Sequence, residues 1–208
     1  MPLYKSITPN SQTSVKIWKI TESYNDLFNA IKLRPANLER VLGMKSELHQ
    51  RGFLSVRHLL KEFGYTDEDL FYDENGKPHL NDGKYISITH SFTFSAVIIS
   101  DNVVGIDIEK QRDKIIIIAH KFIDYEYEYL VEDDADYVKK LTAIWCVKES
   151  LYKLFATPGL SFKKHCLVIP FSMVDETTIA WIAYKNGKHR FNINFLEFEG
   201  FTCAYALT

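Results

Sequence analysis

The sequence predicts an α+β fold in which helical segments lead into β-hairpins twice along the chain. Three observations support this class: helical periodicity early in each half, alternating apolar and polar residues later in each half, and short turn signals between the alternating segments. The order of elements predicts two α+β lobes, residues 1–100 and 101–208, although the sequence contains no periodic repeat.

The first half is predicted to contain one strand, two helices and one turn. These elements cover residues 14–20, 22–31, 39–63 and 73–80. Gly52 is a weak point inside the second helix, whereas Gly64 suits its C-terminal end. The turn is indicated by Asn75-Gly76 and by the proline at position 78.

The second half is predicted to begin at a hairpin that joins residues 85–100 to residues 103–109 through Asp101 and Asn102. Two helical patterns follow, near residues 116–131 and 135–155. Two further strands close the chain, with Glu199-Gly200 as the turn between them. We therefore expect the strand at residues 103–109 to lie near the seam between lobes, where ligand clefts are common.

The composition excludes several classes of protein. Of 208 residues, 46% are hydrophobic, which is enough for a sizeable core, and the formal net charge of −2 argues against a bulk nucleic-acid binder. Three widely spaced cysteines argue against a disulfide framework and favour a reducing cytosol. The first ten residues lack the apolar region of a secretory signal. The aliphatic run at 115–119 is too short to span a bilayer. A cytoplasmic protein without a membrane segment is therefore expected.

Two acids stand side by side on one face of the strand that contains the segment GIDIE. Asp107 and Glu109 alternate with Ile106 and Ile108, so the two carboxylates point the same way, roughly 7 Å apart. Magnesium prefers oxygen ligands and is often held by one or two carboxylates together with substrate phosphates. The alternative is an ordinary solvated face of an antiparallel strand.

The helix at residues 135–155 carries a second charged group. Glu149 and Lys153 are four residues apart and share a face, whereas Lys148 lies among large apolar residues and is expected to pack its stem while its amine reaches outward. The alternative for Glu149 and Lys153 is a surface ion pair worth about 0.3–0.5 kcal/mol.

Candidate anion-binding groups are scattered through the first half. His90 lies between Thr89 and Ser91 in a predicted strand, and it suits a phosphate contact, a base or a hydrogen-bonded core histidine. The bases are Arg34, Arg40, Arg51, Arg57 and Lys77. Each base suits a phosphate ligand and equally suits a surface charge that favours solubility.

Four motifs, taken together and in order, resemble the 4′-phosphopantetheinyl transferase superfamily. They are GKP at 76–78, SITHS at 87–91, VGIDIE at 104–109 and WCVKESLYK at 145–153. The segments RGFLSVRHLL at 51–60 and GLSF at 159–162 are also similar to that family. The closest similarity is to the monomeric two-lobed type that activates peptide and polyketide synthases. Thr89 departs from the serine that is more common there, but it keeps a hydroxyl group.

The resemblance implies two similar α/β lobes related by a pseudo-twofold axis. It also implies an enzyme that transfers the 4′-phosphopantetheine group from coenzyme A to a serine of a carrier protein and releases 3′,5′-ADP. Asp107, Glu109 and Glu149 would bind Mg²⁺, or Mn²⁺, which also suits oxygen ligands. Glu149 would instead, or also, take the serine proton, directly or through a water on the metal. Lys153 would stabilise charge on the phosphates, which makes Asp107, Glu149 and Lys153 the expected catalytic set.

The remaining expected contacts with coenzyme A come from further residues of both halves. They are Lys77, His90, Ser91, Lys148, Lys153, Arg51 and Arg57, of which Lys148 is equally expected to pack or to pair with an acid. The partner would be an acyl or peptidyl carrier protein of fatty-acid, polyketide or non-ribosomal peptide synthesis. It would dock on the apolar segment at 115–130. The alternative is that the isoleucines of this segment fill the seam between lobes. A monomer is expected. The alternatives are a Mg²⁺-dependent phosphohydrolase acting on a nucleotide-like substrate and a non-catalytic relative that binds coenzyme A or a carrier.

Overall fold

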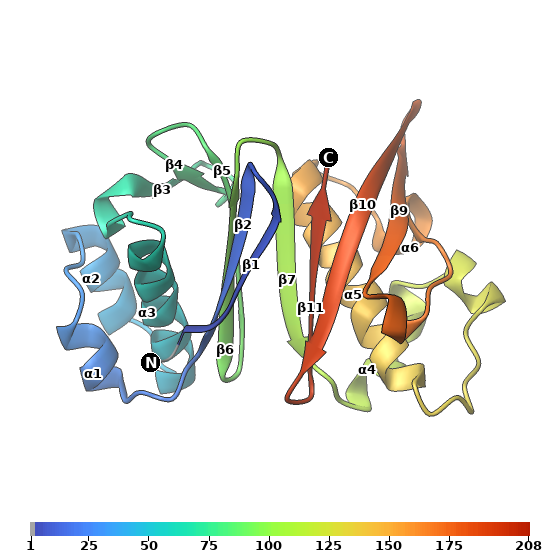
Figure 1. Ribbon diagram of the computed structural model, residues 1–208, viewed down its shortest axis with the longest axis horizontal. Coiled ribbons are helices and arrows are strands. Elements are labelled where there is room, and N and C mark those ends of the chain that lie inside the picture. The colour runs from blue at the N-terminus through green and yellow to red at the C-terminus, as the bar shows by residue number, and fades with distance from the viewer. Residues whose placement is uncertain (1–2) are drawn as a thin grey trace. The chain divides into compact units, whose positions relative to one another are not determined.

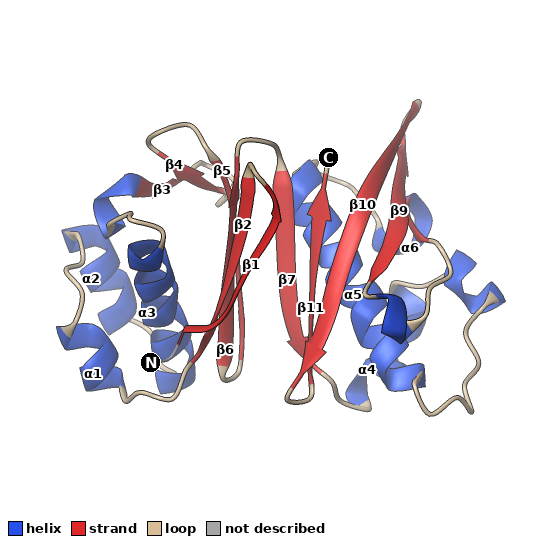
Figure 2. Cartoon of the chain, in the orientation of Figure 1, coloured by secondary structure: helices blue, strands red, loops and turns tan. Residues whose placement is uncertain are grey.

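The computed structural model describes residues 3–208 and divides into two compact units, one ending at Asn102 and the other comprising Val103–Thr208. The division lies two residues after the boundary expected from the sequence. Helices and strands occur in both units, which confirms the α+β class (Figures 1 and 2). No helix in the described part of the chain is long and apolar enough to cross a membrane.

The N-terminal unit contains a four-stranded antiparallel sheet with the strand order β1-β2-β6-β5. Its strands are β1 (Leu3–Asn10), β2 (Thr13–Lys19), β5 (Tyr85–Ser91) and β6 (Phe94–Ser100). The helices α1 (Tyr24–Asn29), α2 (Pro35–Leu42) and α3 (Glu47–Glu62) lie on one side of this sheet (Figure 1). A 3₁₀ turn at Asp67–Asp69 and the short hairpin of β3 (Leu70–Tyr72) and β4 (Pro78–Leu80) complete the unit.

The core of this unit forms between α3 and the sheet. The apolar residues of α3 recur at helical spacing, so Leu54, Leu59 and Leu60 face inward and pack with Val97 and Ile99 of β6. The predicted helix at 39–63 is therefore found as the end of α2 followed by α3. Residues 43–46 separate the two helices, and Gly43 is the C-terminal cap of α2.

The hairpin predicted through Asp101 and Asn102 is wrong. The apolar run at 85–100 is itself a hairpin, because Ser91 pairs with Phe94 and the chain reverses at Phe92, which has a φ of 49°. The strand that begins at Val104 pairs instead with the C-terminal strand of its own unit. The turn escaped the sequence because it contains neither glycine nor asparagine at the left-handed position.

The C-terminal unit is built on a five-stranded antiparallel sheet with the order β7-β11-β10-β9-β8. Its strands are β7 (Val104–Lys110), β8 (Cys166–Val168), β9 (Thr177–Tyr184), β10 (Gly187–Phe198) and β11 (Phe201–Leu207). The long helix α5 (Tyr137–Phe155) packs against the sheet, with α4 (Lys114–Ile118) and α6 (Phe162–His165) beside it (Figure 1).

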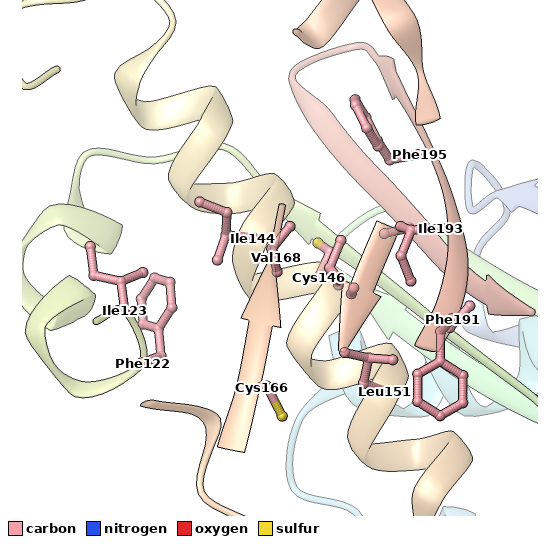
Figure 3. Packing of buried hydrophobic residues seen from close by; sticks show 14 of the residues in the cluster. Phe122, Ile123, Ile144, Cys146, Leu151, Cys166, Val168, Phe191, Ile193 and Phe195 are labelled. Atoms are coloured by element: carbon pink, nitrogen blue, oxygen red, sulfur yellow. The ribbon is translucent and has the colours of Figure 1, made fainter. Parts of the chain in front are cut away.

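Apolar side chains from α5, the sheet and the segment before α5 form the core of the C-terminal unit (Figure 3). The labelled members are Phe122, Ile123, Ile144, Cys146, Leu151, Cys166, Val168, Phe191, Ile193 and Phe195. All three cysteines, Cys146, Cys166 and Cys203, are free thiols buried in this unit.

The helix predicted near residues 116–131 is only partly present. The segment forms the single turn of α4 and the two 3₁₀ turns Ala119–Lys121 and Tyr125–Glu128. A further 3₁₀ turn, Met173–Asp175, occurs later in the unit. Four consecutive β-branched isoleucines have modest helix propensity, and this segment is held by tertiary packing of Phe122 and Ile123 rather than by its own helical pattern.

The contact between α5 and β7 is unusually close at Gly105. A Cβ atom built on Gly105 would lie 1.9 Å from the carbonyl oxygen of Ser150 and 3.1 Å from Cβ of Leu154. Only a residue without a side chain fits there, so Gly105 allows the backbones of β7 and α5 to meet. This close approach brings the next residues of the same strand face toward the last two turns of α5.

Candidate active site

Strand β7 directs its acids toward helix α5. Residues 105, 107 and 109 share one face of the strand because side chains alternate, and Gly105 on that face contacts Ser150 of α5. Asp107 and Glu109 therefore face the helix, which resolves the earlier alternative of a solvated outer face. Asp107 is 5% exposed, so its carboxylate is held within the unit rather than in bulk water.

Lys153 reaches from the last turn of α5 to this strand. Its Nζ donates to Oδ1 of Asp107 at 2.7 Å and to the backbone carbonyl of Ile106 at 3.0 Å. The lysine side chain is 29% exposed and that of Asp107 is 7% exposed, so one end of the pair faces solvent. The Lys153 ammonium is thus a fixed positive charge beside the acids of β7 and not an isolated surface pair with Glu149.

Glu149 lies one turn before Lys153 on α5. The pKa of Glu149 is raised from 4.5 to about 7, chiefly by burial and then by the charge of Asp107; Lys153 lowers it and Glu109 adds a smaller rise. The influence of both β7 acids shows that the three carboxylates share one electrostatic environment. Glu149 is consequently poised to change its protonation state near neutral pH.

The donor chemistry of this group suits a hard divalent cation. Among residues 3–208, no group of three or more His, Cys, Asp or Glu side chains is gathered as a metal site. Carboxylate oxygens are nevertheless the ligands that Mg²⁺ prefers, and substrate phosphates usually supply the rest of its coordination shell. A cation would also relieve the repulsion that raises the pKa of Glu149. The donor types suit the ion although the described residues do not gather three of them, and the metal assignment of Asp107, Glu109 and Glu149 stays a prediction.

Comparison with known proteins identifies the family to which this chain belongs. The model of the 4′-phosphopantetheinyl transferase superfamily matches residues 103–206, half of the chain and nearly all of the C-terminal unit. The chain belongs to the 4′-phosphopantetheinyl transferase superfamily. This confirms the resemblance found in the sequence motifs, and the match includes Asp107, Glu109, Glu149 and Lys153.

A curated member of the superfamily is similar over a longer stretch. It is "4'-phosphopantetheinyl transferase gsp" of Aneurinibacillus migulanus, 28% identical over 162 residues, which cover 74% of this chain. The matched stretch spans 65% of the length of that relative.

Lys148 of this superfamily member does not reach the group of acids. It is fully buried, and its Nζ lies 2.7 Å from Oε1 of Glu126 and donates to the carbonyls of Phe122 at 2.7 Å and Phe162 at 3.3 Å. Desolvation lowers the pKa of Lys148, while Glu126 opposes that shift. The structure contradicts the expectation that Lys148 contacts coenzyme A, because protein oxygens surround its ammonium.

The buried acid Glu126 was not recognised in the sequence. Its carboxylate also accepts hydrogen bonds from the backbone N–H groups of Val168 and Asp124. It therefore ties the segment before α5 to β8 and to α5. The sequence offered one indication, an acid placed among the aromatic residues of FIDYEYEYL, but this pattern does not identify Lys148 as the partner of Glu126.

Arg57 is likewise structural in this superfamily member. Its Nε donates to Asp67 at 3.0 Å, its Nη1 donates to the carbonyl of Phe53, and its guanidinium lies 3.6 Å from the centre of the Phe53 ring. Asp67 also accepts from Asn37 and from the backbone N–H of Arg34. Both side chains of the Arg57–Asp67 pair are at most 3% exposed, which contradicts a contact between Arg57 and coenzyme A.

The other expected coenzyme A contacts lie in the N-terminal unit. Arg51 donates through Nη2 to the carbonyl of Ile20. Lys77 follows a turn in which Asp73 accepts from its backbone N–H. His90 is exposed on β5, where its ring lies against Gly52 of α3, and Ser91 ends that strand. Their contacts with coenzyme A stay predictions.

Proposed function

We propose that the protein transfers the 4′-phosphopantetheine group of coenzyme A to a serine of an acyl or peptidyl carrier protein, releases 3′,5′-ADP and depends on Mg²⁺. The single observation that carries the proposal is the ion pair of Asp107 and Lys153 between β7 and α5, whose charges act on Glu149 one turn earlier in α5, within the unit that matches the superfamily.

The reaction requires little covalent chemistry from the protein. The serine oxygen forms a bond to the phosphorus that carries pantetheine, the bond from that phosphorus to the bridging oxygen breaks, and 3′,5′-ADP leaves with that oxygen. Positioning and neutralisation of negative charge are the main requirements of such a transfer. A fixed ammonium beside the buried carboxylate of Asp107 supports that kind of chemistry.

Each residue has a distinct part in the proposal. Glu149, with a pKa near 7, accepts the serine proton directly or through a water molecule. Lys153 stabilises negative charge on the phosphate oxygens while it holds Asp107 in place. Asp107, Glu109 and Glu149 would hold the metal ion, which when bound supplies charge neutralisation to the pyrophosphate. Lys77, His90, Ser91 and Arg51 contribute contacts with coenzyme A from the N-terminal unit.

Helix α4 supplies a surface for the carrier partner in this proposal. Ile116 and Ile117 are 45% and 71% exposed, whereas Ile115 and Ile118 pack against the core of the C-terminal unit. The aliphatic run therefore has two residues that pack in the core of the C-terminal unit and two that are exposed. Lys114 and Lys121 are exposed beside the isoleucines, and a basic and aliphatic surface suits the acidic helical bundle of a carrier domain.

One assay tests the proposal against its rivals. The protein is incubated with coenzyme A, Mg²⁺ and an apo carrier protein, and the mass of the carrier is measured. A gain of one phosphopantetheine group, absent with Asp107→Ala or Glu149→Ala, supports the transferase. Hydrolysis of a nucleotide-like substrate without a gain in carrier mass would instead support a phosphohydrolase, and binding of coenzyme A without turnover would support a non-catalytic relative.

A further inference from the structure

The imidazole ring of His90 lies directly against the backbone of helix α3 at Gly52. A Cβ atom built on Gly52 would lie 2.9 Å from Nδ1, 3.1 Å from Cγ and 3.3 Å from Cε1 of His90. These distances are shorter than ordinary contacts between carbon and a ring atom. Any side chain at position 52 would displace the His90 ring from its position.

The helix is fixed against the sheet at the same place. Oγ of Ser55, one turn after Gly52, lies 2.8 Å from the carbonyl oxygen of Gly52 and 2.8 Å from Oγ of Ser95 on β6. Ser95 is the residue that pairs with His90 across the β5–β6 hairpin. The Ser55–Ser95 hydrogen bond therefore holds α3 close to the strand position that carries His90, and a shift of the helix to make room for a side chain would break it.

A second imidazole lies beside the first. His49, one turn before Gly52 on α3, has its ring centre 6.4 Å from that of His90, and both residues are exposed. Two imidazoles at this separation can donate to the same anionic group. Glycine is a poor residue for the interior of a helix, and Gly52 lies well inside the 16-residue α3. The close approach of the His90 ring explains why a glycine occurs at this position inside the helix.

We propose that Gly52 is a positioning residue that seats the His90 imidazole on α3 beside His49, so that the two rings together meet a phosphate group of the substrate. The identity of that substrate as coenzyme A rests on the proposed function. The seating of His90 itself does not, because it is a property of the N-terminal unit without ligand.

The first experiment tests the seating in the free protein. NMR signals of the His49 and His90 rings, assigned with His49→Gln and His90→Gln, are compared between the wild type, Gly52→Ala and the control Gly43→Ala. Gly43 ends α2 with a φ of −77°, where alanine is accommodated. We expect Gly52→Ala to shift the His90 signals and Gly43→Ala to leave them unchanged. Unchanged His90 signals in Gly52→Ala would overturn the proposal.

The second experiment measures the effect on the substrate. Gly52→Ala should raise the KM for coenzyme A about tenfold, the loss expected for one hydrogen bond to a charged group, while kcat changes less than twofold. In the His90→Ala background, Gly52→Ala should have no further effect, because the displaced ring is already gone. Equal effects in both backgrounds would overturn the proposal.

Two further outcomes are informative. If Gly52→Ala alone fails to fold, the double variant Gly52→Ala/His90→Ala should fold, since it removes the atoms that clash; failure of the double variant as well would show that Gly52 serves another contact. If the wild type neither binds coenzyme A nor modifies a carrier, the proposed function fails. The ring signals of the free protein then still decide whether Gly52 positions His90.

Discussion

The Lys153 ammonium bridges the side chain of Asp107 and the backbone of the residue before it, with Nζ 2.7 Å from Oδ1 of Asp107 and 3.0 Å from the carbonyl oxygen of Ile106. The two contacts fix the end of α5 to β7 at the point where the strand directs its acids toward the helix. A single lysine thereby both neutralises a nearly buried carboxylate and sets its position.

Replacement of Lys153 by methionine should impair both transfer and folding. The charge that faces the phosphates disappears, and the carboxylate of Asp107, which is 7% exposed, loses its partner. We expect kcat to fall by about 10²–10³-fold and the thermal midpoint to fall as well. The carrier mass assay and thermal unfolding measure the two quantities, and a variant with wild-type kcat would contradict the role of Lys153.

The pH dependence of transfer should follow the ionisation of Glu149. Its pKa is raised from 4.5 to about 7, so the carboxyl is protonated below neutrality and becomes a base only as the pH rises through about 7. In the metal-free protein, titration of Glu149 followed by NMR should show this value. A metal-free titration near 4.5 would contradict the raised pKa. Because a bound cation lowers that pKa, the pH profile of Mg²⁺-dependent transfer should rise at a lower pH than the metal-free titration.

The variant Glu149→Gln should be inactive yet more stable than the wild type at alkaline pH. The folded pKa of Glu149 lies above the unfolded value, so the wild type loses stability as the pH rises from about 4.5 through about 7. Glutamine avoids the buried charge. The difference in free energy of unfolding between variant and wild type should therefore be near zero below pH 4.5 and largest above pH 7. Denaturation without metal at several pH values measures it, and a less stable variant at pH 8 would refute the linkage.

The buried pair of Lys148 and Glu126 should behave as a unit. Both side chains are fully buried, so removal of one leaves the other charge uncompensated. Lys148→Met or Glu126→Gln alone should each cost about 3–5 kcal/mol of unfolding free energy. The double variant should cost clearly less than the sum of the two. Urea denaturation of all four proteins tests this, and strictly additive effects would show that the pair is not coupled.

The alternation along β7 and the helical spacing of Glu149 and Lys153 predicted which side chains share a strand face or a helix face, but they did not predict that the two faces belong to one group. Both periodicities are local, and the superfamily motifs supply the pairing of strand with helix. The partner of Lys148 could not be predicted in this way. Glu126 lies in an irregular segment whose position depends on tertiary contacts, and nothing in its sequence identifies the buried lysine 22 residues later.

Strand pairing was the other part that the sequence did not reveal. The turn at Phe92 requires a left-handed residue, yet its sequence contains no glycine, and the apolar run continues through it. Strand β1 was missed for a different reason: most of its residues are exposed, so an edge strand of this kind carries little apolar alternation. Gly52 was treated as a weak point of a helix because the contact with His90 joins residues 38 positions apart.

The two glycines Gly105 and Gly187 should respond very differently to alanine. A Cβ at position 105 would lie 1.9 Å from the backbone oxygen of Ser150, which cannot move without the helix. A Cβ at position 187 would lie 2.9 Å from the end of the His189 side chain, which can rotate away. Gly105→Ala should therefore lower the unfolding free energy by more than about 3 kcal/mol and reduce transfer, because α5 is forced away from β7. Gly187→Ala should stay within about 1 kcal/mol of the wild type. Denaturation curves of both variants decide the matter, and equal losses would contradict the close contact of α5 with β7.

The burial of Cys146, Cys166 and Cys203 turns the native thiols into a reporter of local opening. All three cysteines of the chain belong to the C-terminal unit. Cys146 and Cys166 belong to the apolar core of that unit, so a thiol reagent labels these two residues only when the unit itself opens. Labelling kinetics, followed by mass, would thus give the opening free energy of one half of the molecule without any introduced probe.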